Sequence, residues 1–411
     1  MEIRPIISAL MRSKVALILI GLQIALTLAI VCNALFIISQ RVETMGRPSG
    51  MNEADTFRIG TIGFGKDFNV KNMIAEDLAT LRQLPGVVDA TPSNTVPMSD
   101  SGWSEAVNMT PEQKVNTTAA AMYFMDEHGV NAFGLKLIAG RNFKPEEITN
   151  RDRNTKGWSP GIIVTKELAQ KLFPGTDAVG KSFYLDQKTG PSTIIGVVDH
   201  LIVPWPRGFV INGDNAAYQY SILVPERNTS GNSAAYLIRT EPGRRDEVMK
   251  AVEAKLVETN HSRIVRSPKT IEKFRAECYA NDRAMMIILG TVIFSLLTIT
   301  ALGIVGMASF WVTQRTKQIG TRRALGATRA AILRYFLTEN FLITTGGLVL
   351  GALLTYGFSF WLMAHSQQGV LLPWHYVPIG FVCMWLLGQI AVFGPATRAS
   401  RVPPAIATRS V

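Results

Sequence analysis

Residues 175–182, Gly-Thr-Asp-Ala-Val-Gly-Lys-Ser, match the G-x-x-x-x-G-K-S pattern of a nucleotide-binding P-loop at every position. A P-loop follows a strand and begins a helix, because the amide groups and the dipole at the helix N-terminus receive the phosphates. Here a helical pattern ending at Leu172 precedes the motif and a strand-like run, 182–185, follows it. The order is reversed, so we reject nucleotide binding and expect two turn glycines and a loop lysine at Gly175, Gly180, Lys181 and Ser182.

Other patterns that could support catalysis or metal binding are weak. The histidines, at 128, 200, 261, 365 and 375, lack the spacing of metal ligands, and no His or Cys pair resembles a zinc site. Asp199-His200 follows a strand-like run, where a pair of polar residues serves either loop chemistry or, more commonly, a solvated turn, and we expect the turn. We therefore expect no catalytic residue, no bound cofactor and no metal in this chain. Of the cysteines only Cys278 lies outside the apolar stretches, which excludes a disulfide within the large central segment.

A basic segment without acidic residues, from Gln314 to Arg334, lies between two long apolar stretches. One interpretation is a determinant of membrane topology that also contacts anionic lipid. The other is a docking helix for a cytoplasmic motor protein.

Four apolar segments are long enough to span a membrane, since about 20 residues of helix cross roughly 30 Å of hydrocarbon. Their apolar stretches, 15–38, 284–313, 341–364 and 373–393, contain no Asp, Glu, Lys or Arg. We expect transmembrane helices at 15–38, 284–313, 337–364 and 377–395. The first is too long for a signal-peptide core and lacks a small-x-small cleavage site, so it is expected to remain as an anchor. Gly347 and Gly351 have the small-x-x-x-small spacing that lets helices approach closely.

The charges are distributed unevenly along the chain. The net charge is +11, yet outside 39–283 only Glu2 and Glu339 are acidic, against these basic residues: Arg4, Arg12, Lys14, Arg315, Lys317, Arg322, Arg323, Arg329, Arg334, Arg398, Arg401 and Arg409. By the positive-inside rule, both termini and the basic segment face the cytoplasm. The segments 39–283 and 365–376 then face outward. Because the basic residues flank apolar helices instead of forming a patch on a soluble domain, we expect no nucleic-acid partner.

The outward segment 39–283 is expected to be mixed α/β. The patterns predict a helix over 75–84 and a strand from 87, a strand over 162–164 with Thr165 capping a helix to 172, and strands over 193–198 and 235–238. Pro242 and Pro268 are expected at helix starts. No helix breaker outside the bilayer follows Pro268, so one helix is predicted from about 268 to 313. The apolar stretches lack the Asp, Glu, Lys and Arg side chains that ion-driven carriers use, so the energy for any transport is expected to come from elsewhere.

The basic segment Gln-Arg-Thr-Lys-Gln-Ile-Gly-Thr-Arg-Arg-Ala-Leu-Gly-Ala-Thr, 314–328, resembles the R-T-x-E-I-G-x-R-R-A-x-G-A-T segment of MacB/FtsX-type ABC transporter permeases. Gly140-Arg-Asn-Phe143, Leu172-Phe-Pro174, Val179-Gly-Lys181 and Ile195-Gly-Val-Val198 are similar to signatures of the family's periplasmic domain. The segment 395–404 resembles its C-terminal tail. Gln314 and Gln318 replace residues that are often acidic in the family.

The resemblance implies an α-helical membrane protein with four transmembrane helices and a large mixed α/β extracytoplasmic domain made of porter and sabre lobes. It implies a non-catalytic permease subunit that couples ATP hydrolysis by a separate cytoplasmic ATPase, which binds the ATP and Mg, to periplasmic motion (mechanotransmission) driving efflux or export. Because the chain begins at Met1 shortly before the first span, we expect no fused ATPase domain. The expected coupling residues are Arg315, Lys317, Gln318, Gly320, Arg322, Arg323 and Gly326.

The expected organisation, in a bacterial inner membrane, is a cytoplasmic segment 1–14, a helix 15–38, a periplasmic domain 39–283, a helix 284–313, a coupling loop or helix 314–336, a helix 337–364, a loop 365–376, a helix 377–395 and a tail 396–411. The expected partners are the ATPase, a second permease in a homodimer or heterodimer, and a periplasmic adaptor. Alternative functions are lipoprotein release, FtsX-like regulation of a periplasmic partner, or sensing.

Overall fold

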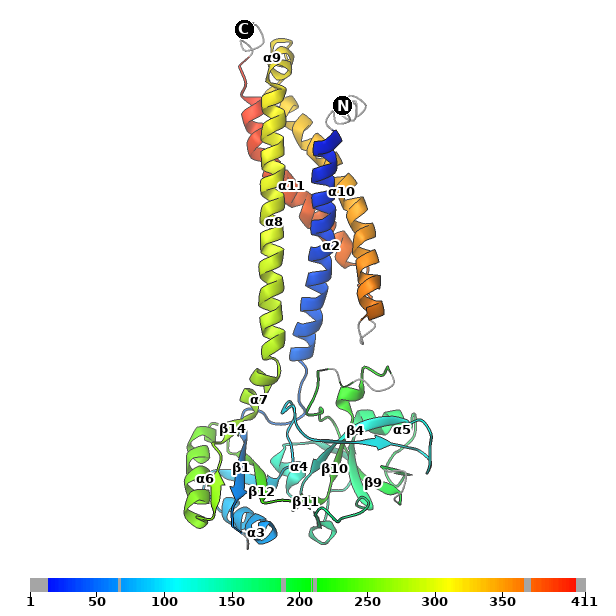
Figure 1. Cartoon of the computed structure of the whole chain (residues 1–411), viewed down its shortest axis with the longest axis vertical. Coiled ribbons are helices and arrows are strands. Elements are labelled where there is room, and N and C mark those ends of the chain that lie inside the picture. Colours follow the sequence, from blue (N-terminus) through cyan, green and yellow to red (C-terminus); the bar gives the residue numbers. More distant parts are fainter. Residues whose placement is uncertain are drawn as a thin grey trace. The chain divides into compact units, whose positions relative to one another are not determined.

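The computed structural model describes residues 14–65, 68–185, 190–207, 209, 213–365 and 371–403. The chain divides into two compact units, Met1–Glu43 with Asp282–Val411, here called the membrane unit, and Thr44–Asn281, here called the α/β domain. Figure 1 follows both along the sequence. The predictions for residues 1–13, 366–370 and 404–411 lie outside the described part of the chain. These residues are most of the expected N-terminal segment, part of the expected 365–376 loop and half of the expected tail.

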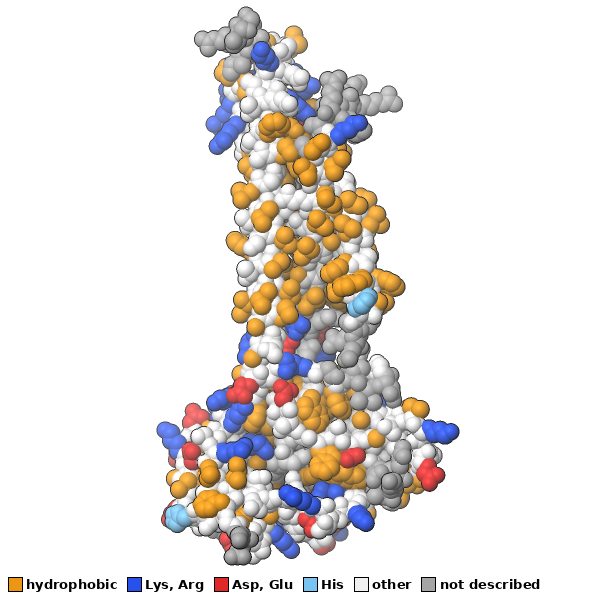
Figure 2. Space-filling model, in the orientation of Figure 1, with side chains coloured by type: hydrophobic (Ala, Val, Ile, Leu, Met, Phe, Trp, Pro, Cys, Tyr) orange, Lys and Arg blue, Asp and Glu red, His pale blue; other side chains and the backbone are white. Residues whose placement is uncertain are grey.

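The membrane unit consists of long apolar helices. Within the described residues, four helices are long and apolar enough to cross a membrane: α2 (Lys14–Met45), α8 (Ala280–Gln314), α10 (Arg329–His365) and α11 (Tyr376–Ser400). This confirms the four expected spans, although the helices extend beyond the predicted bounds. The basic segment, expected as one loop or helix over 314–336, forms the short helix α9 (Thr316–Ala324) and the first turns of α10. Figure 2 shows hydrophobic side chains over the visible face of these helices.

Close contacts at small residues and hydrogen bonds between polar side chains hold the membrane-unit helices together. A Cβ added to Gly347 of α10 would lie 3.0 Å from the carbonyl oxygen of Gly21, and one on Gly351 would lie 3.0 Å from the Cα of Ala25, both in α2. The predicted close approach of helices at these two glycines is thus confirmed. The hydroxyls of Thr27 and Thr300 are 2.8 Å apart and link α2 to α8.

The α/β domain contains two larger sheets. The first is five-stranded, with the order β13-β1-β12-β2 and β14 paired to β1; the strands are β13 (Arg263–Val265), β1 (Thr56–Gly63), β12 (Ser233–Thr240), β2 (Val87–Pro92) and β14 (Lys269–Thr270). Alternate residues of β1, Phe57 and Ile59, join a core with the helices α3 (Val70–Leu81) and α6 (Arg245–Thr259). These helices therefore cover one face of the sheet.

The second sheet is seven-stranded, with the order β3-β4-β10-β7-β9-β5 and β8 paired to β9. Its strands are β3 (Trp103–Val107), β4 (Thr118–Phe124), β10 (Ser221–Val224), β7 (Gly161–Thr165), β9 (Ser192–Val198), β5 (Leu137–Gly140) and β8 (Ser182–Phe183). Both faces are buried, because Ala121 and Tyr123 enter one core while Met122 and Phe124 enter another. The two sheets fit the expectation of a two-lobed α/β domain.

Short elements complete the α/β domain. A two-stranded sheet pairs β11 (Glu226–Asn228) with β6 (Thr149–Arg151). The remaining helices are α4 (Gly129–Ala132), α5 (Lys166–Leu172), α7 (Ile271–Cys278) and the 3-10 turns η1 (Pro145–Glu147) and η2 (Ala217–Gln219). Thr165 is the N-cap of α5 as predicted, but it makes no side-chain cap bond. Its hydroxyl instead donates to the carbonyl of Gln219 at 2.7 Å, because the neighbouring chain before β10 offers an acceptor.

The prediction of one helix from about 268 to 313 is wrong. The chain forms α7 and then α8, and Tyr279 between them leaves helical geometry with φ −98° and ψ 16°. Tyr279 is fully buried in the domain core, so tertiary packing determines its backbone conformation although no Gly or Pro marks the break.

Pro268 and Pro242 both precede their helices, since α7 is capped by Thr270 and α6 begins at Arg245. The expected domain limits, 39 and 283, fall inside α2 and α8.

Candidate functional site

Helix α9 has a defined start and end. At its start, Arg315 leaves helical geometry with φ −101° and ψ 12°, which separates α9 from α8. At its end, Gly326 adopts a φ of +95°, a conformation that side-chain-bearing residues rarely adopt. The amide of Gly326 donates to the carbonyl of Arg323 at 3.2 Å, and that of Ala327 donates to Arg322 at 3.0 Å. This pair of bonds is the Schellman motif, so Gly326 fixes the helix end.

A buried ion pair ties the start of α9 to α10. Arg315 donates from Nη1 to both carboxylate oxygens of Glu339, at 2.8 and 3.0 Å. The side chain of Glu339 is 1% exposed and that of Arg315 is 14% exposed. Sequence reasoning missed Glu339 as a functional partner because it lies just before the apolar stretch. The sequence does mark Glu339, because it is the sole acidic residue after Arg283. A lone acidic residue at a membrane helix is usually paired with a basic side chain.

The inner face of α9 packs onto α10 and α11. Ile319 is buried with Ile332 and Phe336 of α10 and with Ala396 and Ala399 of α11. Arg323 donates from Nη1 to the carbonyl of Ser400 in the last turn of α11. Gly320 is buried as well. Arg315, Gly320 and Arg323 therefore support α9 from inside the membrane unit.

The outer face of α9 is exposed. Its members are Lys317, Gln318, Thr321, Arg322, Ala324 and Leu325. Leu325 is 84% exposed, an unusual state for a large apolar side chain at a helix end. The Arg322 guanidinium lies 4.9 Å from the ring centroid of Tyr335. Among the described residues, neither Lys317 nor Arg322 forms a salt bridge within 4.0 Å, although the charge of Arg322 acts on the more distant Glu339. Figure 2 shows basic side chains gathered at this end of the membrane unit.

The structure thus divides the seven predicted coupling residues. Lys317, Gln318 and Arg322 face outward, while the other four support or end the helix. Leu325 was missed, and only its position beside the turn glycine distinguishes it in the sequence. The outer face combines one exposed apolar side chain, Leu325, with two exposed cations that form no salt bridge among the described residues. This combination suits a partner groove with an apolar floor and an acidic rim.

The P-loop lookalike lies between α5 and β8, in the helix-to-strand order predicted from the sequence. Gly175 and Gly180 have φ of +71° and +83°, as turn glycines do. The Gly180 amide donates to the carbonyl of Ile194 in β9 at 2.8 Å. In a P-loop this amide would bind phosphate, but here it is already hydrogen-bonded to the strand. The Lys181 ammonium donates to the hydroxyl of Thr176 and lies 4.9 Å from the Phe173 ring centroid.

His200 differs from the solvated turn expected for it. Its side chain is 20% exposed, its Nδ1 lies 3.3 Å from Oε1 of Glu167, and its Nε2 lies 3.1 Å from the carbonyl oxygen of Pro48. The hydrogen bond to Glu167 raises the pKa of His200, against a smaller opposing effect of burial. Among the described residues, no group of three or more His, Cys, Asp or Glu side chains is arranged to hold a metal ion.

Two families of domains match this chain. The MacB-like periplasmic core domain matches residues 16–255, and the FtsX-like permease C-terminal domain matches residues 290–404. The macrolide export ATP-binding/permease protein MacB of Brucella melitensis is 26% identical over 410 residues, which are 96% of this chain and 57% of that protein. The ABC transporter permease YknZ of Bacillus subtilis is 26% identical over 295 residues, 71% of this chain and 70% of that protein.

A solved structure is also similar. The periplasmic region of MacB from Actinobacillus actinomycetemcomitans is 15% identical, with a TM-score of 0.33, covering 55% of this chain and 94% of that one. The chain spans about half the length of most curated relatives that it matches. The match to the MacB-like domain extends over more than half of the residues. The chain therefore belongs to the family of ABC transporter permeases that combine a MacB-like periplasmic core domain with an FtsX-like C-terminal permease domain.

Proposed function

We propose that this chain is a permease subunit through which a separate cytoplasmic ATPase, with its ATP and Mg, drives conformational change of the α/β domain across the membrane. The observation that carries the proposal is helix α9, which is fixed to α10 and α11 from within and exposes Lys317, Gln318, Arg322 and Leu325. A rigidly supported helix transmits a push from a bound partner to the spans, whereas a loosely attached one would absorb it.

The sidedness follows from the charges. With the basic residues of α9 and of the terminal flanks on one side, the positive-inside rule supports a cytoplasmic location of that side, in the bacterial inner membrane that we propose. A cysteine replacing exposed Gln318 should resist a membrane-impermeant thiol reagent in intact spheroplasts, and a cysteine replacing exposed Glu146 should react. The native cysteines are first replaced by alanine. The reverse labelling pattern would refute the topology.

The proposed direction of transport is export. Curated relatives are named for macrolide export, which supports efflux by the same architecture. A second permease, identical or related, would complete the transporter. Several apolar side chains on α8 are exposed in the isolated chain, Ile287 at 71%, Phe294 at 72% and Leu302 at 65%, and thus offer a surface for that subunit or for lipid. A periplasmic adaptor would bind the α/β domain.

The coupling proposal is tested with the complex purified from its native membrane. Lys317→Glu with Arg322→Glu, and separately Leu325→Asp, should reduce transporter-stimulated ATPase activity about tenfold or more, because interface anchors commonly contribute that much. Arg334→Glu is the control, since it reverses an exposed charge on α10 that is not one of the residues of the outer face. Arg323 is avoided because it bonds to Ser400. ATPase activity that is unchanged in both variants, with normal membrane insertion, would overturn the proposal.

A further inference from the structure

A cavity of about 610 Å³ lies within the α/β domain. It borders the face of the five-stranded sheet that is opposite α3 and α6, because Phe57 and Ile59 of β1 enter the helix-side core while Arg58 and Gly60 line the cavity. Residues near the second sheet, Asn94 and Phe124, form another wall. A cavity of several hundred Å³ suits a small organic ligand.

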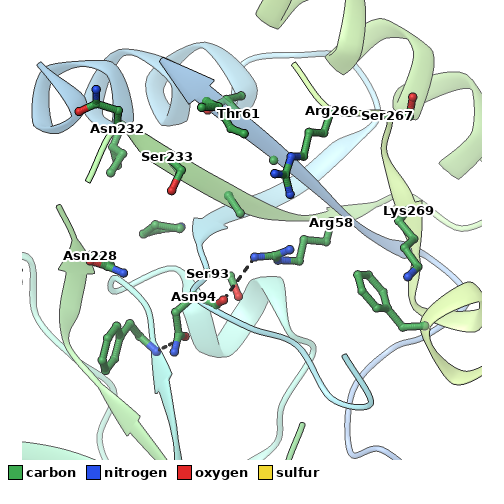
Figure 3. A pocket seen from close by; sticks show the side chains of 18 of the residues that line it. Arg58, Thr61, Ser93, Asn94, Asn228, Asn232, Ser233, Arg266, Ser267 and Lys269 are labelled. Carbon is green, nitrogen blue, oxygen red and sulfur yellow. Dashed lines mark hydrogen bonds between the residues drawn. The ribbon is translucent and has the colours of Figure 1, made fainter. Parts of the chain in front are cut away.

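Two arginines enter this cavity from different segments. Arg58 comes from β1, and Arg266 follows β13, where its backbone amide donates to the carbonyl of Gly60 at 2.8 Å. Figure 3 shows both guanidinium groups ending in the same part of the pocket. Arg58 donates from Nη2 to the carbonyl of Asn94 at 3.3 Å, while its Nε is buried without a hydrogen-bond partner. Burial, followed by the charge of Arg266, lowers the pKa of Arg58 to about 10.

The acidic groups near the cavity are already paired. Glu226 accepts from Arg151 at 3.0 Å and from the hydroxyl of Ser159 at 2.8 Å. Lys269, the third cation of the lining, pairs with Glu277 and lies 4.0 Å from the ring centroid of Phe274. Among the described residues, no carboxylate is paired with Arg58 or Arg266. Arg58 is partly buried and Arg266 is exposed, and the charge of Arg266 disfavours the charged form of Arg58. An anion bound between the two guanidinium groups would relieve this repulsion.

The remaining lining defines the chemistry of a ligand. Guanidinium forks match the oxygen geometry of carboxylate and phosphate groups. Hydroxyl and amide side chains, including Ser93, Ser233 and Asn232, add polar contacts, and Ile62, Phe124 and Phe274 add apolar walls. We propose that this cavity binds a small organic anion, with its carboxylate or phosphate group between Arg58 and Arg266 and its apolar body against the two phenylalanines.

This site goes beyond the coupling function proposed above and does not depend on it, since ligand binding can be measured without any ATPase. Titration calorimetry of the full chain in detergent, corrected with empty micelles, uses benzoate and phenyl phosphate as organic anions. Benzamide is the neutral analogue, and inorganic phosphate tests the charged group alone. We expect benzoate or phenyl phosphate to bind, and benzamide and inorganic phosphate to bind at least several-fold more weakly.

The variant Arg266→Gln should weaken binding of the organic anion roughly tenfold or more, because a charge-assisted hydrogen bond is lost. Arg58→Lys, which keeps the charge but not the fork, should weaken it as well. Arg153→Gln is the control, since Arg153 is exposed, does not line the cavity and donates to the carbonyl of Ser230. The proposal is overturned if neither organic anion binds, if benzamide or inorganic phosphate binds equally well, or if correctly folded Arg266→Gln, judged by an unchanged melting temperature, retains wild-type affinity.

Discussion

Arg315, at the start of α9, uses one guanidinium nitrogen to bind both carboxylate oxygens of Glu339 in the span α10. The two side chains come from segments that are separated by the whole of α9 and the turn after it. Because Glu339 is almost completely buried, its charge is tolerated only with this partner in place. The pair thus determines where α9 sits on the membrane unit.

Breaking this pair should destabilise the membrane unit strongly. Arg315→Ala or Glu339→Ala should each cost about 3–5 kcal/mol, the usual cost of leaving a buried charge without its partner. The double variant should cost clearly less than the sum of the two, because no charge is then left unpaired. Equilibrium unfolding in detergent measures the three free energies. Strictly additive values would show that the two side chains do not interact.

Replacing Gly326 should weaken coupling without removing the protein from the membrane. Gly326→Ala places a side chain at a φ of +95° and should cost roughly 1–2 kcal/mol, loosening the end of α9 and lowering stimulated ATPase activity. Gly175→Ala imposes similar strain at a φ of +71° in the α/β domain. That control should leave ATPase stimulation unchanged. Equal losses of stimulation in both variants would argue against a specific role of the α9 end.

The contact between α2 and α10 should be sensitive to side-chain size at one glycine and not at its neighbour. Gly347→Leu inserts a large side chain where even a Cβ lies 3.0 Å from Gly21, and should cost about 1–3 kcal/mol or more. Gly346→Leu is the matched control, because nothing lies within 4 Å of its added Cβ. Thermal unfolding in detergent compares the two. Similar melting temperatures for both variants would contradict the close packing described here.

His200 should make stability depend on pH. Since the fold raises its pKa above the usual value of about 6.5, the protonated form is favoured in the folded state. This stabilisation is fully present below the pKa that His200 has in the unfolded chain. It is lost as the pH rises through the higher pKa of His200 in the folded protein. The melting temperature, followed by tryptophan fluorescence, should therefore fall more steeply with rising pH in the wild type than in His200→Gln. His261→Gln, at an exposed position, should retain the wild-type slope.

Much of the architecture follows from local patterns in the chain. Uninterrupted apolar stretches predict the four long helices, and the change to alternating or short apolar runs predicts strands such as β7, β9 and β12. The helix-to-strand order around residues 175–182 also followed from the neighbouring patterns. The basic segment indicated the region of α9, because its charges and glycines lie close together in the sequence.

The missed features depend on contacts between distant segments. The break at Tyr279 comes from burial of its side chain in the domain core, which no local pattern indicates. The support that Arg323 gives through Ser400 requires α11 to return beside α9. Likewise Arg58 and Arg266 meet only because β13 pairs with β1, so the cavity could not be recognised from either residue alone.

Helix α9 carries its supports within the C-terminal part of the chain, since Glu339, Ile332 and Ser400 all follow it in sequence. The Arg58–Arg266 cavity is built entirely from residues before Asn281. The proposed motor-binding surface and the proposed ligand cavity are therefore encoded on opposite sides of that asparagine. A crossover of genes at this point would exchange one of them and leave the residues of the other unchanged, while α2 would meet a new partner at Gly347 and Gly351 of α10.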